Sequence, residues 1–383
     1  MRILHTIEGL GAKFGGIATC TYDLISSLNG SGVDVDILSP SLRDNDDRLL
    51  GIEEQWNKCY PNDGIGPINY SRNLNKWLNS TQYDLYHTNG MWQYIVHETC
   101  AHARREKKPY IITPHGMLYP EALARSAWKK WSMRKLWFNR DIREASCIHA
   151  TCQKEMENIR LLGYQGPIAV IGNPVAVPDF VDELFKARYA KSSPFMGVAF
   201  LGRLHPIKKV ENLLYGVASA TVRDLNVFII GKGDDNYERF LKSEAECLGI
   251  ADRVHFLGFL NGFDKYAQLA MIDALFVPSD MENFGMIIPE ALIVGTPVMA
   301  SLGTPWESLN TERCGWWCDN APETIAAVID ELYSMSDEER LAMGSRGRDF
   351  ILRSFAADQV AAKMHRLYQW LSGEAEKPEF VYD

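Results

Sequence analysis

Two cations in the second half of the sequence have the types and the spacing to bind a diphosphate. Arg203 and Lys208 follow the apolar stretch 197–202 and are five residues apart. A guanidinium offers a planar fork of donors to phosphate oxygens, and an ammonium offers a mobile positive charge. The pair would hold a diphosphate without a metal ion. Taken alone, two such cations are more often solvated surface charges.

Two carboxylates further along the chain suit hydroxyl-bearing ligands. Seven residues separate Glu282 from Glu290, and Phe284-Gly285-Met286 between them indicates a tight turn into a helix that starts near Met286. The first N–H groups of such a helix have no partners within it. Carboxylates accept hydrogen bonds from hydroxyls, so the pair suits two polyols, such as a ribose and a hexose. The acid/base pair of a glycosidase is the alternative, which the phosphate-binding residues nearby disfavour.

The first half has a glycine-rich turn after its first predicted strand. Gly9, Gly11, Gly15 and Gly16 precede a helical run, and such turns offer backbone N–H groups to an anion. The dinucleotide fingerprint G-x-G-x-x-G is not met, because its third glycine comes one residue late. With Asp34 and Asp36 near the place of a ribose-binding acid, NAD binding remains a weak alternative.

Three histidines lie at the ends of predicted strands in the first half. His115 stands in Pro114-His115-Gly116, and we favour a functional role for it over that of a packed core histidine. For His5 and His87 the packing role is favoured.

The elements that must position these residues alternate between short apolar strands and helical runs. This alternation predicts βαβ units, parallel sheets and two Rossmann-like domains that face each other across a cleft. Ligands of such sheets lie beyond the carboxyl ends of the strands. The predicted strands are 2–7, 33–39, 84–88, 110–114, 146–150, 168–172, 197–202, 226–231, 253–258, 273–278 and 297–301.

The domain boundary is expected near 173–195, with a loop or linker at 190–194. After residue 320 the sequence predicts no further strands and three helices, the second opened by a capping box of Ser336 and Glu339. Residues 373–383 are interpreted as a tail. The predicted organisation is 1–175, 176–353 and a C-terminal helix and tail, 354–383, that crosses back to the first domain.

Composition limits the class of protein. The 383 residues carry a formal net charge of −9 and are 46% hydrophobic, which excludes global disorder and argues against a general nucleic-acid binder. Eight scattered cysteines lack the spacing of a zinc site, and we expect free thiols. The sequence shows neither a signal peptide nor a run of 18 apolar residues, so a cytoplasmic protein without a membrane span is expected.

One segment, 125–144, is strongly basic and aromatic within this acidic chain. Its cations are Arg125, Lys129, Lys130, Arg134, Lys135, Arg140 and Arg143, interleaved with Trp128, Trp131, Trp137 and Phe138. Three interpretations stay open. The segment binds single-stranded nucleic acid, lies at an anionic bilayer at the inner face of the membrane, or packs its tryptophans into the first domain.

The motifs GRLHPIK and VPSDMENFGMIIPEALIVGTPVMAS resemble those of the retaining nucleotide-sugar glycosyltransferases of family 4, the glycosyl transferases group 1, with the GT-B fold. The E-x7-E signature of that family corresponds to Glu282 and Glu290. The glycine pair before the first helix, Thr113-Pro114-His115-Gly116 and Asn173-Pro174-Val175 also fit. The resemblance covers residues 1 to about 320.

The resemblance implies a role for each residue. Arg203 and Lys208 would hold the donor diphosphate, Glu290 the ribose, and Glu282 the transferred sugar. The backbone of Phe284, Gly285, Met286 and Ile287 would bind the donor, Gly16 would approach its phosphates, and His115 would face the reacting centre. The first domain would bind the acceptor and the second the nucleotide sugar. Two positions depart from the family pattern: Lys209 replaces a usual glycine, and Lys232 stands where small or acidic residues are common.

The expected activity is retaining, metal-independent hexosyl transfer from a UDP-sugar or GDP-sugar to a glycan or lipid-linked acceptor, in bacterial surface polysaccharide or glycolipid synthesis. No cofactor, no metal and no nucleic-acid partner are expected. The alternatives are a nucleotide-sugar epimerase or hydrolase of the same fold and a catalytically silent sugar-nucleotide-binding subunit.

Overall fold

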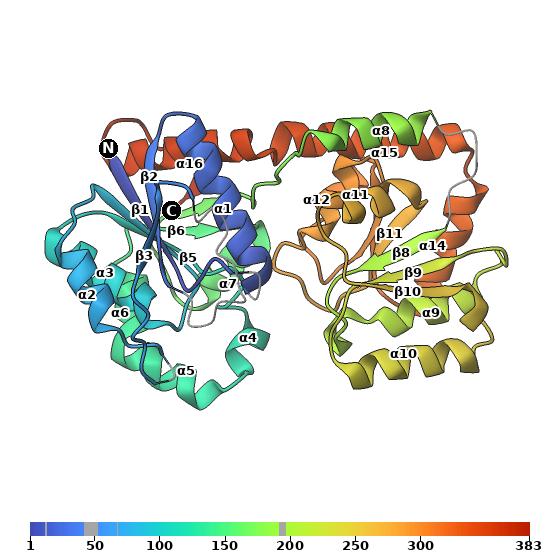
Figure 1. Ribbon diagram of the computed structural model, residues 1–383, viewed down its shortest axis with the longest axis horizontal. Coiled ribbons are helices and arrows are strands. Elements are labelled where there is room, and N and C mark those ends of the chain that lie inside the picture. The colour runs from blue at the N-terminus through green and yellow to red at the C-terminus, as the bar shows by residue number, and fades with distance from the viewer. Residues whose placement is uncertain (12–13, 42–52, 67, 191–196) are drawn as a thin grey trace. The chain divides into compact units, whose positions relative to one another are not determined.

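The computed structural model describes residues 1–11, 14–41, 53–66, 68–190 and 197–383, so most of the predicted linker at 190–194 lies outside the described residues. The described chain divides into two compact units. The first is Met1–Ala176 together with Ala357–Asp383, and the second is Val177–Ala356. Each unit contains one twisted β-sheet with helices on its faces (Figure 1).

The sheet of the first unit has the strand order β14-β7-β6-β5-β4-β1-β2-β3. All pairs are parallel except that of β14 with β7. The six strands predicted in this half are confirmed to within two residues. The strands are β1 (Arg2–Ile7), β2 (Asp34–Pro40), β3 (Asn57–Tyr60), β4 (Leu85–Asn89), β5 (Tyr110–Thr113), β6 (Cys147–Ala150), β7 (Ile168–Val170) and β14 (Val381–Tyr382).

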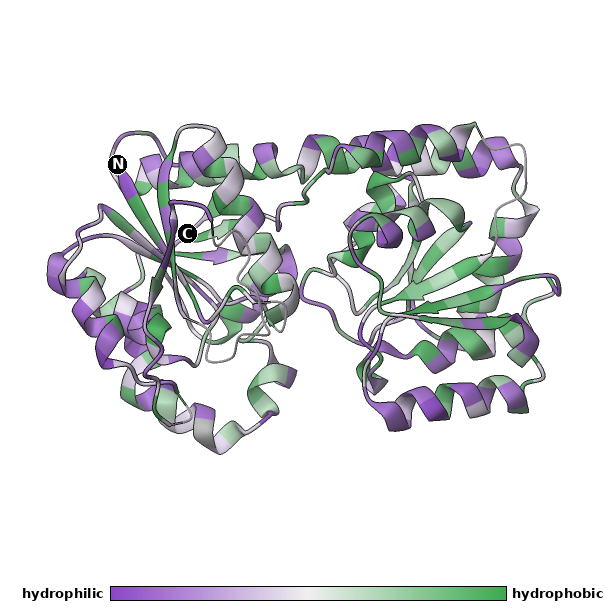
Figure 2. Cartoon of the chain, viewed as in Figure 1, coloured by the Kyte–Doolittle hydropathy of each residue, from purple (hydrophilic) through white to green (hydrophobic). Residues whose placement is uncertain are grey.

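Both faces of this sheet are buried, because neighbouring residues of a strand point to opposite sides. Ile3 packs in a cluster with α1 (Gly15–Gly30) and α16 (Ala357–Leu371), whereas Leu4 packs with the helices of the other face. Figure 2 shows the apolar strands at the middle of the unit. The remaining helices of this unit are α2 (Arg72–Asn79), α3 (Tyr94–Glu106), α4 (Pro120–Ala124), α5 (Ala127–Met133), the π-helix η2 (Arg134–Phe138), α6 (Asn139–Arg143) and α7 (Gln153–Leu161).

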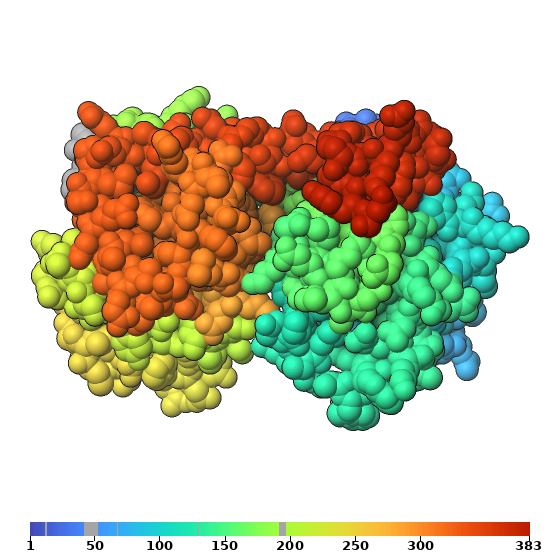
Figure 3. Space-filling view, turned by 180° about the vertical axis from the view of Figure 1, so that it is seen from behind, coloured from blue at the N-terminus to red at the C-terminus, as the bar shows by residue number. Residues whose placement is uncertain are grey.

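The prediction that 373–383 form a tail without strands is wrong. Val381 and Tyr382 form the edge strand β14 and pair with Ala169 and Ile168 of β7, and the Val381 side chain is buried. Figure 3 shows these last residues lying against the first unit. The segment is too short and too polar to carry a strand signal of its own, and only the free edge of β7 makes it a strand.

The second unit has a six-stranded parallel sheet in the order β10-β9-β8-β11-β12-β13. The five strands predicted here are confirmed, and β13 was missed. The strands are β8 (Val198–Leu201), β9 (Val227–Ile230), β10 (Val254–Gly258), β11 (Ala274–Val277), β12 (Val298–Ser301) and β13 (Gly315–Cys318).

The helices of the second unit pack on both faces of its sheet. The predicted C-terminal helices are confirmed, and Ser336 and Glu339 form the predicted capping box. Among the residues that the structure describes, no helix is long and apolar enough to cross a membrane. The helices are α8 (Phe180–Tyr189), η3 (Pro206–Lys208), α9 (Val210–Ser219), α10 (Asp235–Cys247), η4 (Ala251–Arg253), α11 (Gly262–Met271), α12 (Ile287–Ile293), α13 (Ser308–Thr311), α14 (Pro322–Ser334) and α15 (Asp337–Ser354).

Each sheet has one point at which the strand order reverses. In the first unit it lies between β1 and β4, and in the second between β8 and β11. Loops that leave the carboxyl ends of such strands run in opposite directions and leave a crevice, which is where open α/β sheets bind ligands. The candidate residues should therefore follow these four strands.

Candidate functional site

The loops after β8 and β9 cross at very close range in the second unit. The N–H of Leu204 donates to Lys232 O at 3.1 Å, and Leu204 forms a parallel bridge with Gly233. Gly231 has a φ of +138°, and a Cβ there would lie 1.8 Å from the carbonyl oxygen of Gly202. Glycine is required at this crossing, and the cations Arg203 and Lys232 are carried on its two loops.

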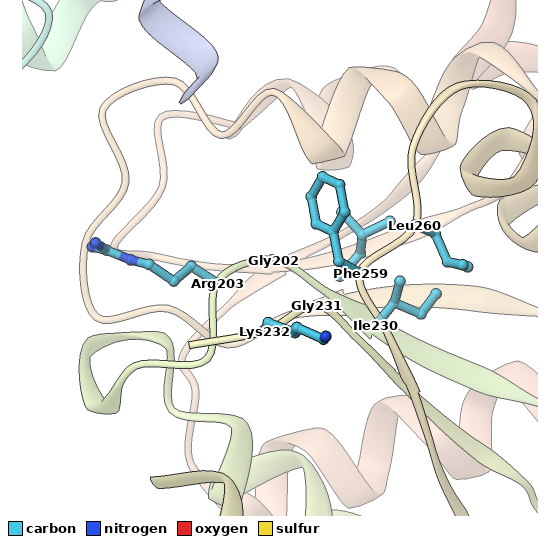
Figure 4. Close-up of a pocket in the computed structure, with 8 residues that line it drawn as sticks. Gly202, Arg203, Ile230, Gly231, Lys232, Phe259 and Leu260 are labelled. Atoms are coloured by element: carbon cyan, nitrogen blue, oxygen red, sulfur yellow. The ribbon is translucent and has the colours of Figure 1, made fainter. Parts of the chain in front are cut away.

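A pocket of about 520 Å³ lies at this crossing (Figure 4). Arg203 points away from the ring of Phe259, which stands with Ile230 and Leu260 on the other side of the pocket. Arg203 and Lys232 are exposed, and Phe259 is 67% exposed. The pocket thus combines cations with an exposed aromatic ring, which suits a phosphorylated heterocycle. Its residues are Leu201, Gly202, Arg203, Ile230, Gly231, Lys232, Phe259 and Leu260.

An ion pair joins the loops on the two sides of the strand reversal. The ammonium of Lys208 in η3, after β8, donates to Oε1 of Glu282, after β11. Ser279 donates to the same oxygen at 2.9 Å, and the N–H of Glu282 donates to Gly303 O at 3.1 Å. Both side chains of the pair are less than one-fifth exposed. Lys208, which is predicted to bind the diphosphate, therefore directly contacts Glu282, which is predicted to bind the sugar.

The loop after Glu282 turns sharply into α12, as the sequence predicted. Gly285 has a φ of +76°, and its carbonyl accepts from Ile288 N at 2.9 Å. Within the described chain, the N–H groups of Phe284, Gly285 and Met286 donate to no protein acceptor. These donors, which precede Ile287, the first residue of α12, are available to an oxygen-rich ligand.

Glu290 lies in α12 and is paired with a lysine that the sequence analysis did not identify. Lys265 of α11 approaches its Oε1 to 2.9 Å, and both side chains are mostly buried. Burial raises the pKa of Glu290, and the ammonium of Lys265 opposes that rise. Each of the two carboxylates of the motif is thus held by one lysine.

Lys209 adopts the left-handed conformation that glycine favours. Its φ is +51°, and it links η3 to α9. Its ammonium lies 3.7 Å from Asp280 and 3.8 Å from Glu211. The backbone of this chain therefore keeps the turn for which a glycine is usual, in spite of the lysine.

Gly16 lies in the first turn of α1, the helix that follows β1 in the chain. A pocket of about 250 Å³ is lined from the loop after β1 and the loop after β4, at the strand reversal of this sheet. Glu8 and Gly9 contribute from the first loop, and Gly90 and Met91 from the second. Phe14 and Ile17, on either side of Gly16 in the chain, line the same pocket, so this turn borders the crevice that the topology predicts.

His115 sits in a strained turn held on both sides. Its φ is +52°, and its Nε2 lies 3.3 Å from Oδ1 of Asn89. The N–H of Gly116 donates to Oε1 of the fully buried Glu155 at 2.5 Å. Burial and, to a smaller extent, His149 lower the pKa of His115 to about 3, so this imidazole is neutral near pH 7.

Below this turn, three histidines form a buried hydrogen-bonded chain. Tyr368 of α16 lies between His5 and His87, at 2.7 and 3.0 Å, and Thr113 lies between His87 and His149, at 2.6 and 2.8 Å. Burial is the first cause of the lowered pKa of all three histidines, about 3 for His5 and about 4 for His149. The packing role predicted for His5 and His87 is confirmed.

The weak alternative of NAD binding is not supported. Asp36 is buried inside β2, where its Oδ2 accepts from Arg2 and from the hydroxyl of Tyr83, both at 2.7 Å. The carboxylate of Asp36 therefore binds side chains of the first unit and is not available to a ribose.

The structure brings some of the predicted residues together and separates others. Lys208 contacts Glu282, and Arg203 lines the neighbouring pocket, whereas Gly16 and His115 belong to the other unit. Sequence reasoning missed Lys265, Asn89, Glu155 and Ser279. Asn89 and Ser279 come directly after predicted strands, and this position in the sequence could have identified them. Lys265 and Glu155 are identified only by their contacts.

The comparisons with protein families match both halves of the chain. Residues 15–174 match "Glycosyl transferase 4-like domain", and residues 182–350 match "Glycosyl transferases group 1". Two curated relatives resemble less than half of the chain. They are the D-inositol 3-phosphate glycosyltransferase of Salinispora tropica, at 32% identity, and the GDP-mannose-dependent alpha-(1-6)-phosphatidylinositol monomannoside mannosyltransferase of Mycobacterium tuberculosis, at 29%. The matches cover 45% and 44% of this chain and 37% and 46% of those relatives.

Solved structures resemble the whole chain in fold. The Anabaena protein HepE in complex with UDP superposes with a TM-score of 0.75 at 19% identity, covering 97% of this chain and 100% of that one. Sucrose-phosphate synthase of Thermosynechococcus elongatus superposes with a TM-score of 0.74 at 19% identity, covering 98% and 100%. The observed arrangement of two parallel-sheet domains is the GT-B fold.

Proposed function

This chain belongs to the glycosyltransferases of family 4 with the GT-B fold, and from that premise we propose that it is a retaining, metal-independent hexosyltransferase. The donor is a UDP-sugar or GDP-sugar, and the acceptor is a hydroxyl of a glycan or glycolipid of a bacterial surface. The observation that carries the proposal is the placement of Arg203, Lys208 and Glu282 at the strand reversal of the second sheet.

The donor nucleotide is assigned to the pocket at the ends of β8, β9 and β10. Its base packs on the ring of Phe259, and Lys232, which lines the same pocket, binds the base or a phosphate. Glu290 accepts the ribose hydroxyls. Lys265 opposes the rise in the pKa of this carboxyl that burial causes, and so favours the ionised form that accepts them.

The diphosphate is assigned to Arg203 and Lys208. The leaving diphosphate gains negative charge as the bond to the sugar breaks, so fixed cations stabilise the transition state more than the ground state. Glu282 and the N–H groups of Phe284, Gly285 and Met286 hold the transferred hexose. Lys208, already bonded to Glu282, then couples the position of the sugar to that of the phosphates.

We assign Gly16 and His115 of the first unit to the same reaction, Gly16 at the phosphates and His115 at the transferred sugar. The neutral imidazole of His115 can accept or donate one hydrogen bond without adding charge. Retention follows from attack on the face that the diphosphate leaves. A phosphate oxygen then takes the proton of the acceptor hydroxyl.

Binding of nucleotides tests the donor assignment. UDP, GDP and ADP are each added to the protein, and the thermal midpoint is measured by differential scanning fluorimetry. A ligand at 100 times its Kd stabilises the folded protein by about 2.7 kcal/mol. We expect a shift with UDP or GDP that Arg203→Ala and Lys208→Ala both lose.

Lys209→Ala is the matched control, because this neighbouring lysine has only long contacts of 3.7 and 3.8 Å with acids. It should keep the nucleotide shift. The donor assignment is wrong if no diphosphate shifts the midpoint, or if both alanine variants bind as tightly as the parent.

A further inference from the structure

The basic and aromatic segment of the first unit exposes large apolar side chains. Trp128 and Trp131 of α5 are 72% and 61% exposed, and Leu136 of η2 is 68% exposed. Lys135 lies over the ring of Trp131 at 4.3 Å. The interpretation that all these tryptophans pack into the domain is therefore wrong for two of the three.

A change of helix type divides the aromatic residues of this segment. In η2 the N–H of Asn139 donates to Arg134 O, five residues earlier, so the turn is wider than that of an α-helix. Trp137 stacks on His97 at 5.2 Å, and Phe138 is buried in the core. Trp137 and Phe138 therefore face the interior of the unit, whereas Leu136 and Trp131 are exposed.

A pocket of about 500 Å³ lies at the residues that follow Trp131 in this segment. It is lined by Arg134, Asn139, Ile142, Arg143 and the loop 162–166. Leu161, one residue before that loop, is 82% exposed. Exposed apolar side chains, Leu136 and Leu161, therefore lie close in the sequence to the residues that line the pocket.

The two arginines of the pocket keep their charge available. Arg134 donates only to the amide of Asn139, at 3.3 Å, and within the described chain neither it nor Arg143 forms an ion pair with a carboxylate. By contrast, Arg140 is paired with Glu144 at 3.1 Å, and the buried Asp141 is paired with Arg104 at 2.7 Å. Asp141 of α6 and Glu144 directly after it are therefore paired with cations other than Arg134 and Arg143.

We propose that this surface binds an anionic lipid bilayer, with the pocket of Arg134 and Arg143 receiving a phosphate headgroup. Exposed tryptophans favour the interface between headgroups and acyl chains. Arginine forks match phosphate oxygens, and each cation near an anionic surface adds to the attraction. The inference goes beyond the proposed glycosyl transfer, because it rests on residues of the first unit that the reaction does not use.

The test is co-sedimentation of the full chain with vesicles of phosphatidylcholine alone and with vesicles containing phosphatidylglycerol. We expect binding to the anionic vesicles only, weakened at high salt. Arg134→Gln/Arg143→Gln and Trp128→Ser/Trp131→Ser should each weaken it at least tenfold. Circular dichroism and the thermal midpoint check that both variants fold.

Matched controls come from the second unit. Arg239→Gln/Lys242→Gln removes the same charge from the exposed face of α10, and Phe263→Ser removes a ring that is 54% exposed. Both should bind vesicles as the parent does. Equal loss in the charge control would show that only net charge matters and would overturn the proposal.

Two further measurements distinguish a lipid bilayer from other anionic ligands. Inorganic phosphate and a single-stranded oligonucleotide are titrated against the protein under the same conditions. Saturation by phosphate without vesicle binding, or tighter binding of the oligonucleotide than of vesicles, overturns the lipid assignment. Nucleotide binding in the second unit is measured in parallel, so failure here is distinguishable from failure of the proposed donor site.

Discussion

The hydroxyl of Tyr368 lies 3.0 Å from Nδ1 of His87, 281 positions earlier in the chain. The same hydroxyl is 2.7 Å from Nε2 of His5. Through Asn89, which contacts both His5 and His115, the chain of hydrogen bonds reaches the candidate catalytic turn. Helix α16 is therefore linked by hydrogen bonds to the turn of His115. The hydroxyl of Tyr368 is a positioning group.

Removing this hydroxyl should destabilise the first unit. In Tyr368→Phe two buried imidazoles lose a partner, and each buried polar group left without one costs about 1–3 kcal/mol. With two such groups, we expect urea unfolding to show a loss of about 2–6 kcal/mol. Tyr382→Phe, at an exposed tyrosine, is the control and should change little. Equal stability of Tyr368→Phe and the parent would show that the hydroxyl does not support the histidines.

The buried histidines should make the first unit sensitive to acid. His5, His87, His115 and His149 all have a lowered pKa in the folded chain, so the unfolded chain binds more protons below its own pKa of about 6.5. Stability therefore falls as the pH falls from about 6.5 toward 3–4. His102, whose pKa is also lowered by burial, adds to this effect, and Glu155, whose pKa is raised by burial, opposes it. Urea midpoints at pH 7.5, 6.5 and 5.5 measure the slope, and a flat profile would contradict the assignment.

The pair of Lys265 and Glu290 should set the pH range of donor binding. Without the ammonium, burial alone acts on the carboxyl, so Lys265→Met should raise its pKa further. UDP or GDP binding should then weaken as the pH falls from 8 to 6 in the variant, with a smaller change in the parent. Calorimetric titration at both pH values measures this. Lys242→Met, at an exposed ion pair with Glu238, should behave as the parent.

Transfer should not need a divalent metal. Arg203 and Lys208 supply the charge that a metal would bring to the diphosphate, so activity should persist in excess EDTA. The measurement is the rate of UDP or GDP release with sugar donor and acceptor, with and without EDTA. Complete loss that Mg²⁺ or Mn²⁺ restores would refute the two-cation assignment.

The product should keep the anomeric configuration of the donor sugar. This follows from attack on the face that the diphosphate leaves. Proton NMR of the product immediately after transfer reports the anomeric coupling. An inverted anomer would exclude the proposed mechanism.

The sequence by itself determined the fold class and the strand ends on which the candidate residues lie. Alternation of short apolar strands with helical runs is a local property, and eleven strands were located to within two residues because most of them are buried on both sides and read as short apolar runs. The placement of Arg203, Lys208 and Glu282 after parallel strands followed from that pattern alone.

Only the tertiary structure decided which of these residues meet. The pairing of Lys208 with Glu282 and of Lys265 with Glu290 depends on the strand order, which no local pattern encodes. β14 forms because β7 offers it a free edge, and Trp131 is exposed whereas Trp137 stacks on His97, a residue of α3. Such contacts join residues far apart in the chain, so their free energy exists only once the fold brings them together.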